Sequence, residues 1–167
     1  MRIAHDYRVA AITGPTALAI GNFDGVHRGH QHLFARVVKA ARGWGGPCVV
    51  LTFDPHPTRV LAPTRAAPKL TGLDRRLELM TDAGLDLAVV QRFDLAFAAL
   101  SAREFVERVV LGLGAREVYV GHDFHFGRDR EGDGAVLRAL AAELGFVAHV
   151  LDPITDGALP VSSTRTR

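Results

Sequence analysis

The sequence predicts an α/β domain with a Rossmann-like, three-layer α/β/α fold and a five-stranded, mostly parallel sheet. Short apolar runs alternate with segments whose apolar residues recur at helical spacing, which is the pattern of strand–helix–strand units. Several of these runs are continuously apolar, as expected for strands that helices cover on both faces. At 167 residues, the chain suits one domain and is long enough to bury a sizeable core.

The expected elements follow one another with the spacing of strand–helix–strand units. Strands are predicted at residues 17–20, 48–53, 87–91, 117–121 and 146–151, and helices at residues 30–42, 72–82, 102–111 and 134–144. Thr71 and Ser101, each followed three residues later by an acid, resemble the start of capping boxes. Gly84 and Gly145 stand where helices commonly end. Ligands of such sheets bind beyond the carboxyl ends of the strands, so the residues after each strand are the site candidates.

Composition and charge limit the kinds of partner that we expect for this protein. The formal net charge is only +2 and the arginines are scattered among acids, so no nucleic-acid partner is expected. No apolar run reaches membrane-spanning length and no signal-peptide pattern is seen, so we expect a cytoplasmic protein with no membrane partner. The single cysteine, Cys48, lies in an apolar run and is expected in the core. Arginine, which dominates the 20 basic residues, suits phosphate recognition.

The loop after the first strand carries the strongest chemical signal. Residues 21–30 read Gly-Asn-Phe-Asp-Gly-Val-His-Arg-Gly-His, and the following helix begins at their end. Unpaired amides and the helix dipole favour an anion at that point. His27 and His30 could donate hydrogen bonds to a phosphate whose charge grows in a transition state. The alternatives are a turn with two solvated histidines and a metal pair, although no third ligand has a convincing position and no metal site is assigned.

The string at residues 21–30 resembles the His-x-Gly-His signature of a nucleotidyltransferase superfamily. Its full form is similar to the FAD synthetase (FMN adenylyltransferase) module of the bacterial bifunctional riboflavin kinase/FMN adenylyltransferases. Five further segments resemble that module in order: residues 51–57 (Leu-Thr-Phe-Asp-Pro-His-Pro), 71–80, 93–106, 120–127 (Val-Gly-His-Asp-Phe-His-Phe-Gly) and 161–167 (Val-Ser-Ser-Thr-Arg-Thr-Arg). Thr166 departs from the family, which places Ile or Val there.

The resemblance implies a role for each matching position. His27, His30 and Arg167 would be the catalytic residues. The residues that would bind ATP are Gly21, Asn22, Phe23, Asp24, Gly29, both histidines, Ser163, Thr164 and Arg167, of which the last three would hold the leaving pyrophosphate. The residues that would flank the flavin are Phe53, Asp54, His56, Pro57, Asp123 and Phe124.

The implied reaction transfers AMP from ATP to the phosphate of FMN by direct in-line attack, giving FAD and pyrophosphate. Its partners would be ATP, FMN and the Mg²⁺ that accompanies ATP. Residues 1–167 would form one nucleotidyltransferase domain, without the riboflavin kinase domain to which relatives are fused. Two other functions stay open: a nucleotidyltransferase with another phosphorylated acceptor, and a non-catalytic flavin- or nucleotide-binding domain.

Two features of the segment after the fourth predicted strand have alternative interpretations. His122 and His125 have the spacing of a metal pair, but a phosphate or solvent contact for His125 is favoured because both lie inside the matched motif. Residues 127–132 are rich in glycine and charge, which favours a mobile, solvated loop over a phosphate cradle.

Overall fold

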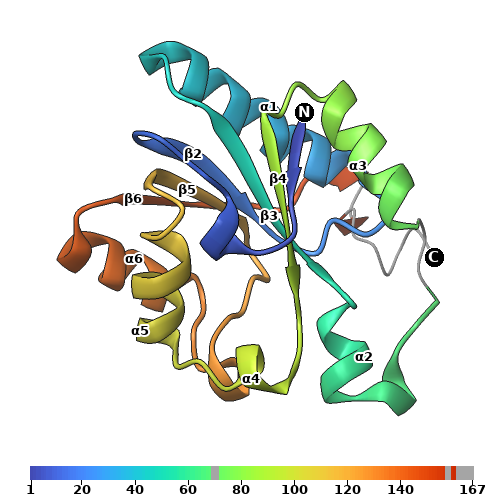
Figure 1. Ribbon diagram of the computed structural model, residues 1–167. Coiled ribbons are helices and arrows are strands. Elements are labelled where there is room, and N and C mark those ends of the chain that lie inside the picture. Colours follow the sequence, from blue (N-terminus) through green and yellow to red (C-terminus); the bar gives the residue numbers. More distant parts are fainter. Residues whose placement is uncertain (69–71, 157–158, 161–167) are drawn as a thin grey trace.

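The computed structural model describes residues 1–68, 72–156 and 159–160. It confirms the three-layer fold, with a parallel sheet between two layers of helices (Figure 1). The sheet order is β1-β4-β3-β2-β5-β6, and every neighbouring pair is parallel. The strands are β1 (Arg2–Ala4), β2 (Thr16–Ile20), β3 (Cys48–Asp54), β4 (Leu87–Arg92), β5 (Ala115–Gly121) and β6 (Val147–Leu151).

The sheet has six strands, so the prediction of five was one short. The additional strand, β1, is three residues long and pairs with β4 through Arg2–Leu87 and Ile3–Ala88. It has no run of buried apolar residues, because it lies at an edge of the sheet where Ile3 stays 46% exposed. Backbone pairing with β4 therefore creates this strand, and no sequence pattern marks it. A separate antiparallel pair joins β7 (Thr155–Asp156) and β8 (Leu159–Pro160).

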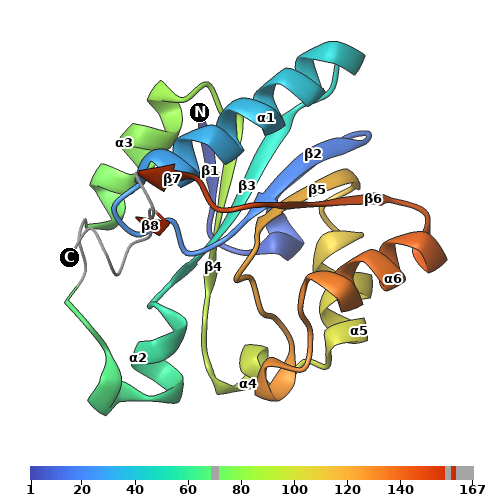
Figure 2. The ribbon, with the colours of Figure 1, turned by 180° about the vertical axis from the view of Figure 1, so that it is seen from behind.

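The sheet divides the core into two halves, because alternate residues of each strand face opposite sides. Leu18 and Ile20 of β2 pack with residues from the helices on one side, whereas Ala17 and Ala19 pack with residues from the other. The first side is covered by α5 (Ala102–Glu104), η3 (Phe105–Val110) and α6 (Gly134–Leu144). The second side is covered by α1 (Arg28–Trp44) and α3 (Leu73–Asp82), which Figure 2 shows together from behind. Cys48 belongs to this second half of the core, as expected.

The helix ends follow most of the predicted signals. Ser101 forms the predicted capping box, in which its hydroxyl accepts the Glu104 amide and the Glu104 carboxylate accepts the Ser101 amide. Gly145 ends α6 in the left-handed conformation, and Gly84 follows α3 with a φ of 93°. Thr71 lies outside the described residues. The predicted helix at residues 102–111 changes after Glu104 into the wider turns of a π-helix, η3.

The strand order creates a switch point beside β2. From β2 the chain builds β3 and β4 on one side, and then crosses to build β5 and β6 on the other. The carboxyl ends of β2 and β5 are therefore neighbours, and their loops diverge there. Two short helices, α2 (Pro57–Leu61) and α4 (Leu95–Ala98), lie beyond the same end of the sheet (Figure 1). None of the helices in the described residues is long and apolar enough to cross a membrane.

Candidate active site

A cleft of about 1170 Å³ opens at the carboxyl ends of the strands. It brings together most of the residues predicted for the two substrates. Those that line it are Gly21, Asn22, Phe23, Asp24, His27, Gly29, His30, Phe53, His56, Pro57, Asp123 and Phe124. Asp54 does not line the cleft; its carboxylate lies 4.0 Å from the guanidinium of Arg76. Ser163, Thr164 and Arg167 lie outside the described residues, so their roles stay predictions.

The two histidines form a stacked pair at the start of α1. Their ring centroids are 3.7 Å apart and their planes differ by 20°. His27 is the N-cap of the helix, and its Nδ1 accepts a hydrogen bond from the amide of Gly29 at 3.1 Å. An accepting Nδ1 carries no proton, so a neutral His27 ring carries its proton on Nε2. His27 can therefore donate from Nε2 into the cleft.

Both histidines are held in the neutral form. Burial lowers the pKa of His27, and the carboxylate of Asp123 partly opposes this shift. Burial, reinforced by the neighbouring His27, lowers the pKa of His30 to about 3. Nδ1 of His30 is buried and has no hydrogen-bond partner in the part of the chain that is described. An anion beside the rings would raise the pKa of both histidines and favour their protonated form, so this pair is suited to phosphate.

The loop between β2 and α1 is strained. Phe23 and Val26 have φ values of 54° and 40°, which non-glycine residues adopt only at a cost, most of all a β-branched one. Phe23 is held by its ring contacts with Phe34 at 4.8 Å and with His30 at 5.1 Å. Gly21 must lack a side chain, because a Cβ there would lie 2.9 Å from the Phe23 ring. The glycine and the strained turn thus set where the loop backbone meets the histidines.

Aromatic rings line another part of the cleft. Phe53 contacts Phe93 and Phe97 at centroid distances of 6.0 and 5.9 Å. The series continues from Phe97 to Phe105 at 6.1 Å and from Phe105 to Phe126 at 5.3 Å. Phe124 stacks on Phe126 at 5.4 Å. Such a surface suits a flat, largely apolar ring system.

The sequence-based prediction of flavin contacts missed several residues of this aromatic wall. Phe93 and Phe97 are four residues apart after β4, and that spacing at a strand end was the available signal. Helix α2 was also not predicted, because its five residues are too few to show periodicity. His56 caps α2 by accepting the Thr58 amide on Nδ1 at 3.1 Å, and Pro57 occupies its first turn. A proline after a histidine cap was the local sign of this helix.

The loop after β5 is more firmly attached than the prediction of a mobile loop implied. The Arg128 amide donates to the Leu100 carbonyl at 2.7 Å, and the Glu131 carboxylate accepts the Ala102 amide at 2.7 Å. Gly127 packs so close to the α5 backbone that a Cβ would lie 2.7 Å from the Ala102 nitrogen. The charged side chains of the loop are nevertheless exposed, as expected. The backbone contacts hold this loop as one wall of the cleft.

Exposed arginines add positive charge to the rim of the cleft. Arg59 and Arg65 come from the α2 region, and Arg128 and Arg130 from the loop after β5. The Nδ1 atom of His125 lies 2.9 Å from the Asp123 carbonyl and 3.1 Å from Arg130 Nη2. Within the described residues, no group of three histidine, cysteine or acidic side chains could hold a metal ion.

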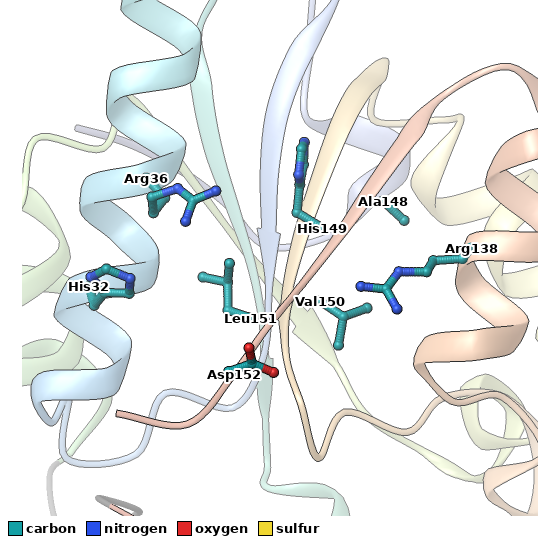
Figure 3. A pocket seen from close by; sticks show the side chains of 8 residues that line it. All are labelled: His32, Arg36, Arg138, Ala148, His149, Val150, Leu151 and Asp152. Carbon is teal, nitrogen blue, oxygen red and sulfur yellow. The ribbon is translucent and has the colours of Figure 1, made fainter. Parts of the chain in front are cut away.

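A second, smaller groove of about 370 Å³ follows the outer strand β6. Figure 3 shows Arg36 from α1 and Arg138 from α6 extending toward β6 from opposite sides. His149, between them, is 3.1 Å from Glu117 and stacks on Tyr119 at a centroid distance of 4.4 Å. Because that ring is already engaged, the groove offers no histidine pair comparable to the one in the larger cleft.

Similarity to known proteins extends over nearly the whole chain. A family model described as FAD synthetase matches residues 9–165. The bifunctional riboflavin kinase/FMN adenylyltransferase of Escherichia coli (strain K12) is 38% identical over 151 residues, which cover 90% of this chain and 48% of that protein. A putative protein of the same description from Geobacillus thermodenitrificans (strain NG80-2) is 43% identical over 154 residues, 91% of this chain and 80% of that protein.

The fold also has a solved counterpart. A crystal structure described as a macrolide-efflux protein from Streptococcus pneumoniae matches with a TM-score of 0.85 and 26% identity, over 98% of this chain and 55% of that chain. The chain spans about half the length of the E. coli protein, since the alignment covers 48% of it. Residues 9–165, which the family model matches, include the histidine pair and the residues that line the cleft.

Proposed function

The chain belongs to the FAD synthetase family, and from this premise we propose that it is an FMN adenylyltransferase that converts FMN and ATP into FAD and pyrophosphate. The observation that carries the proposal is the stacked, neutral pair His27 and His30, which lies in the same cleft as a wall of phenylalanine rings. The cleft thus combines a phosphate-binding point for ATP with a flat apolar surface for the flavin ring of FMN.

The chemistry requires positioning and charge stabilisation. An oxygen of the FMN phosphate attacks the α-phosphorus of ATP, a new P–O bond forms, and the bond from the α-phosphorus to the bridging oxygen breaks to release pyrophosphate. A phosphate monoester is already an anionic nucleophile at neutral pH, so no strong general base is needed. His27 Nε2–H and the positive end of the dipole of the 17-residue helix α1 stabilise the charge that grows on the α-phosphate.

The cleft has room for both substrates. Its volume of about 1170 Å³ exceeds the roughly 300–1000 Å³ common for a single small-ligand pocket. The isoalloxazine ring of FMN lies against Phe53, Phe97 and their neighbours, and the adenine nucleotide lies along residues 21–30. The rim arginines attract the phosphates of both substrates. Ser163, Thr164 and Arg167 are proposed to hold the pyrophosphate.

Magnesium enters the proposal as part of the ATP substrate. The described residues contain no cluster of ligands for an ion of their own. Mg²⁺ commonly keeps several waters and binds through substrate phosphates. Bound with ATP, the ion would neutralise phosphate charge, and the histidines and backbone amides would bind the complex. Riboflavin kinase activity, which the names of the relatives include, forms no part of this proposal.

The test is the choice of acceptor. The protein is incubated with ATP, Mg²⁺ and either FMN or riboflavin, and the products are identified by chromatography and mass spectrometry. FMN should give FAD and pyrophosphate, and riboflavin should give neither, because it lacks the attacking phosphate. If FMN stays unchanged while another phosphorylated acceptor is adenylylated, the enzyme class survives but the assigned substrate is wrong.

A further inference from the structure

Arg76 of α3 is a buried arginine that the reaction outlined above does not use. The residue is only 4% exposed. Burying a guanidinium is costly unless hydrogen bonds and counter-charges surround it. Burial lowers the pKa of Arg76, and the nearby carboxylates of Asp54 and Asp24 oppose that shift. The fold therefore maintains a charged group here at a considerable energetic cost.

The hydrogen bonds of Arg76 converge on one backbone carbonyl. Its Nη1 donates to the carbonyl oxygen of Asn22 at 2.6 Å and lies 3.3 Å from Oγ1 of Thr52. The Thr52 hydroxyl donates to the same Asn22 oxygen at 3.0 Å. Nη2 lies 4.0 Å from the Asp54 carboxylate. One guanidinium thus joins the loop after β2 to the end of β3, which are separate in the sequence.

The Asn22 carbonyl immediately precedes the strained part of the loop between β2 and α1, residues 21–27, which we call the nucleotide loop. Phe23 follows with a φ of 54° and places its ring edge-on to His30, at a centroid distance of 5.1 Å. His30 in turn stacks on His27. A strained backbone persists only where its surroundings hold it. The two donors on the Asn22 carbonyl, from Arg76 and Thr52, provide such a restraint at the start of the strained turn.

We propose that Arg76 is a positioning residue for adenylyl transfer, which fixes the nucleotide loop against the end of β3. This inference rests on the proposed function. Through Asn22 it sets the place of the histidine pair, and through Asp54 it sets the β3 end beside the flavin side of the cleft. Arg76 thereby keeps the α-phosphorus of ATP and the phosphate of FMN in attacking geometry, without touching either.

One further detail separates this role from simple core packing. Nε of Arg76 is buried and has no hydrogen-bond partner among the residues that the structure describes. A buried ion pair is often replaceable by apolar residues without loss of stability. An incompletely satisfied arginine is therefore poorly explained by stability alone. The planar guanidinium can contact a carbonyl and a carboxylate at the same time, which explains why an arginine occupies this position.

The test compares Arg76→Met, Arg76→Lys and Thr52→Val with Arg75→Met as the matched control. Arg75 precedes Arg76 on α3, but it is exposed and pairs with Glu78 at 2.7 Å. FAD formation is measured at saturating substrates, per mole of folded protein, at a temperature where circular dichroism shows each variant folded. Long-range ¹H–¹⁵N spectra of the imidazoles give a second reading, because they report the tautomer and surroundings of His27 and His30 without any turnover.

We expect Arg76→Met to lower kcat about 100-fold, the cost of small misplacements of reacting groups, with a much smaller change in KM for ATP. Arg76→Lys should have a kcat between those of Arg76→Met and the wild-type protein, and Thr52→Val should lose less kcat than Arg76→Met. The imidazole signals should shift in all three variants and stay in place in Arg75→Met. If Arg76→Met does not fold, Arg76→Lys and Thr52→Val still decide the question.

The inference is overturned if Arg76→Lys and Thr52→Val keep the wild-type kcat and imidazole signals. A lowered free energy of unfolding with kcat unchanged would assign Arg76 to core stability alone, and would also overturn it. If the wild-type protein makes no FAD, the proposed function fails, but the imidazole spectra still test whether Arg76 positions the histidines. The two failures are therefore distinguishable.

Discussion

Acid should destabilise this protein partly through one histidine, His30. Burial and the neighbouring His27 lower its pKa from 6.5 to about 3 in the folded state. The unfolded chain therefore takes up this proton first as the pH falls, and stability is lost from about pH 6.5 downward. The loss in the free energy of unfolding that is due to His30 grows by about 1.4 kcal/mol for each pH unit below the pKa of the unfolded chain. Between pH 7.5 and pH 5.0, His30 should account for a loss of about 2 kcal/mol in the free energy of unfolding.

The predicted loss in the free energy of unfolding does not depend on the precise pKa of His30 in the folded protein. At pH 5.0 the ring is neutral in the folded protein whether its pKa is 3 or a unit higher, so the same number of protons is taken up on unfolding. Urea unfolding at pH 7.5 and 5.0 measures the loss in the wild-type protein, in His30→Gln, and in His32→Gln. His32 is an exposed residue of the same helix.

The wild-type protein and His32→Gln should lose about 2 kcal/mol more than His30→Gln over this pH interval. The reason is that the glutamine takes up no proton in either state. An equal loss in all three proteins would show that His30 is not held neutral by the fold. The description of the histidine pair as a neutral phosphate-binding point would then be wrong.

Three other changes test the cleft and its walls. His27→Ala should lower kcat by about 100- to 1000-fold, the usual cost of removing a transition-state donor, while calorimetry shows ATP binding nearly unchanged; equal losses in both would assign His27 to ground-state binding. Phe97→Ala should weaken FMN binding about 2- to 10-fold through the lost ring contacts, with ATP binding as the internal control, and an unchanged FMN affinity would place the flavin elsewhere. Gly127→Ala should cost about 1–3 kcal/mol in urea unfolding, because its φ is 78° and the added Cβ would meet the α5 backbone at 2.7 Å; a neutral result would contradict the tight contact.

Most of the fold could be predicted from the sequence because its core strands are covered on both faces. Residues 48–51 and 87–90 are continuously apolar, and both runs lie in strands whose side chains are buried. Strand β1 could not be predicted in the same way, since its identity depends on a free edge of β4. Helix α2 depends on a histidine cap and a proline over five residues, which are too few for a periodic signal.

The site was predictable to the extent that its chemistry is local in the sequence. His27 and His30 are three residues apart at the junction of a loop and a helix, so their spacing alone indicates a pair at the start of that helix. The wall formed by Phe53, Phe93 and Phe97 combines strand β3 with the segment that follows β4, and its assembly depends on the pairing of these two strands in the sheet. Helical spacing places Arg76, three residues after Leu73 and four before Met80, on the apolar face of α3, but its partner Asn22 is 54 residues away in the sequence. Only the packing of α3 against the sheet shows that this arginine contacts the Asn22 carbonyl.

The most direct test of the account follows the α-phosphate. The protein is mixed with FMN and Mg²⁺-ATP labelled at the α-phosphorus, and labelled FAD and pyrophosphate are quantified over the first turnovers. The label should pass into FAD with one pyrophosphate released for each FAD formed, and the double variant His27→Ala/His30→Gln should lose this transfer. If FMN and ATP both bind but no labelled FAD forms, or if the label is retained on the protein, adenylyl transfer by direct attack in this cleft is contradicted.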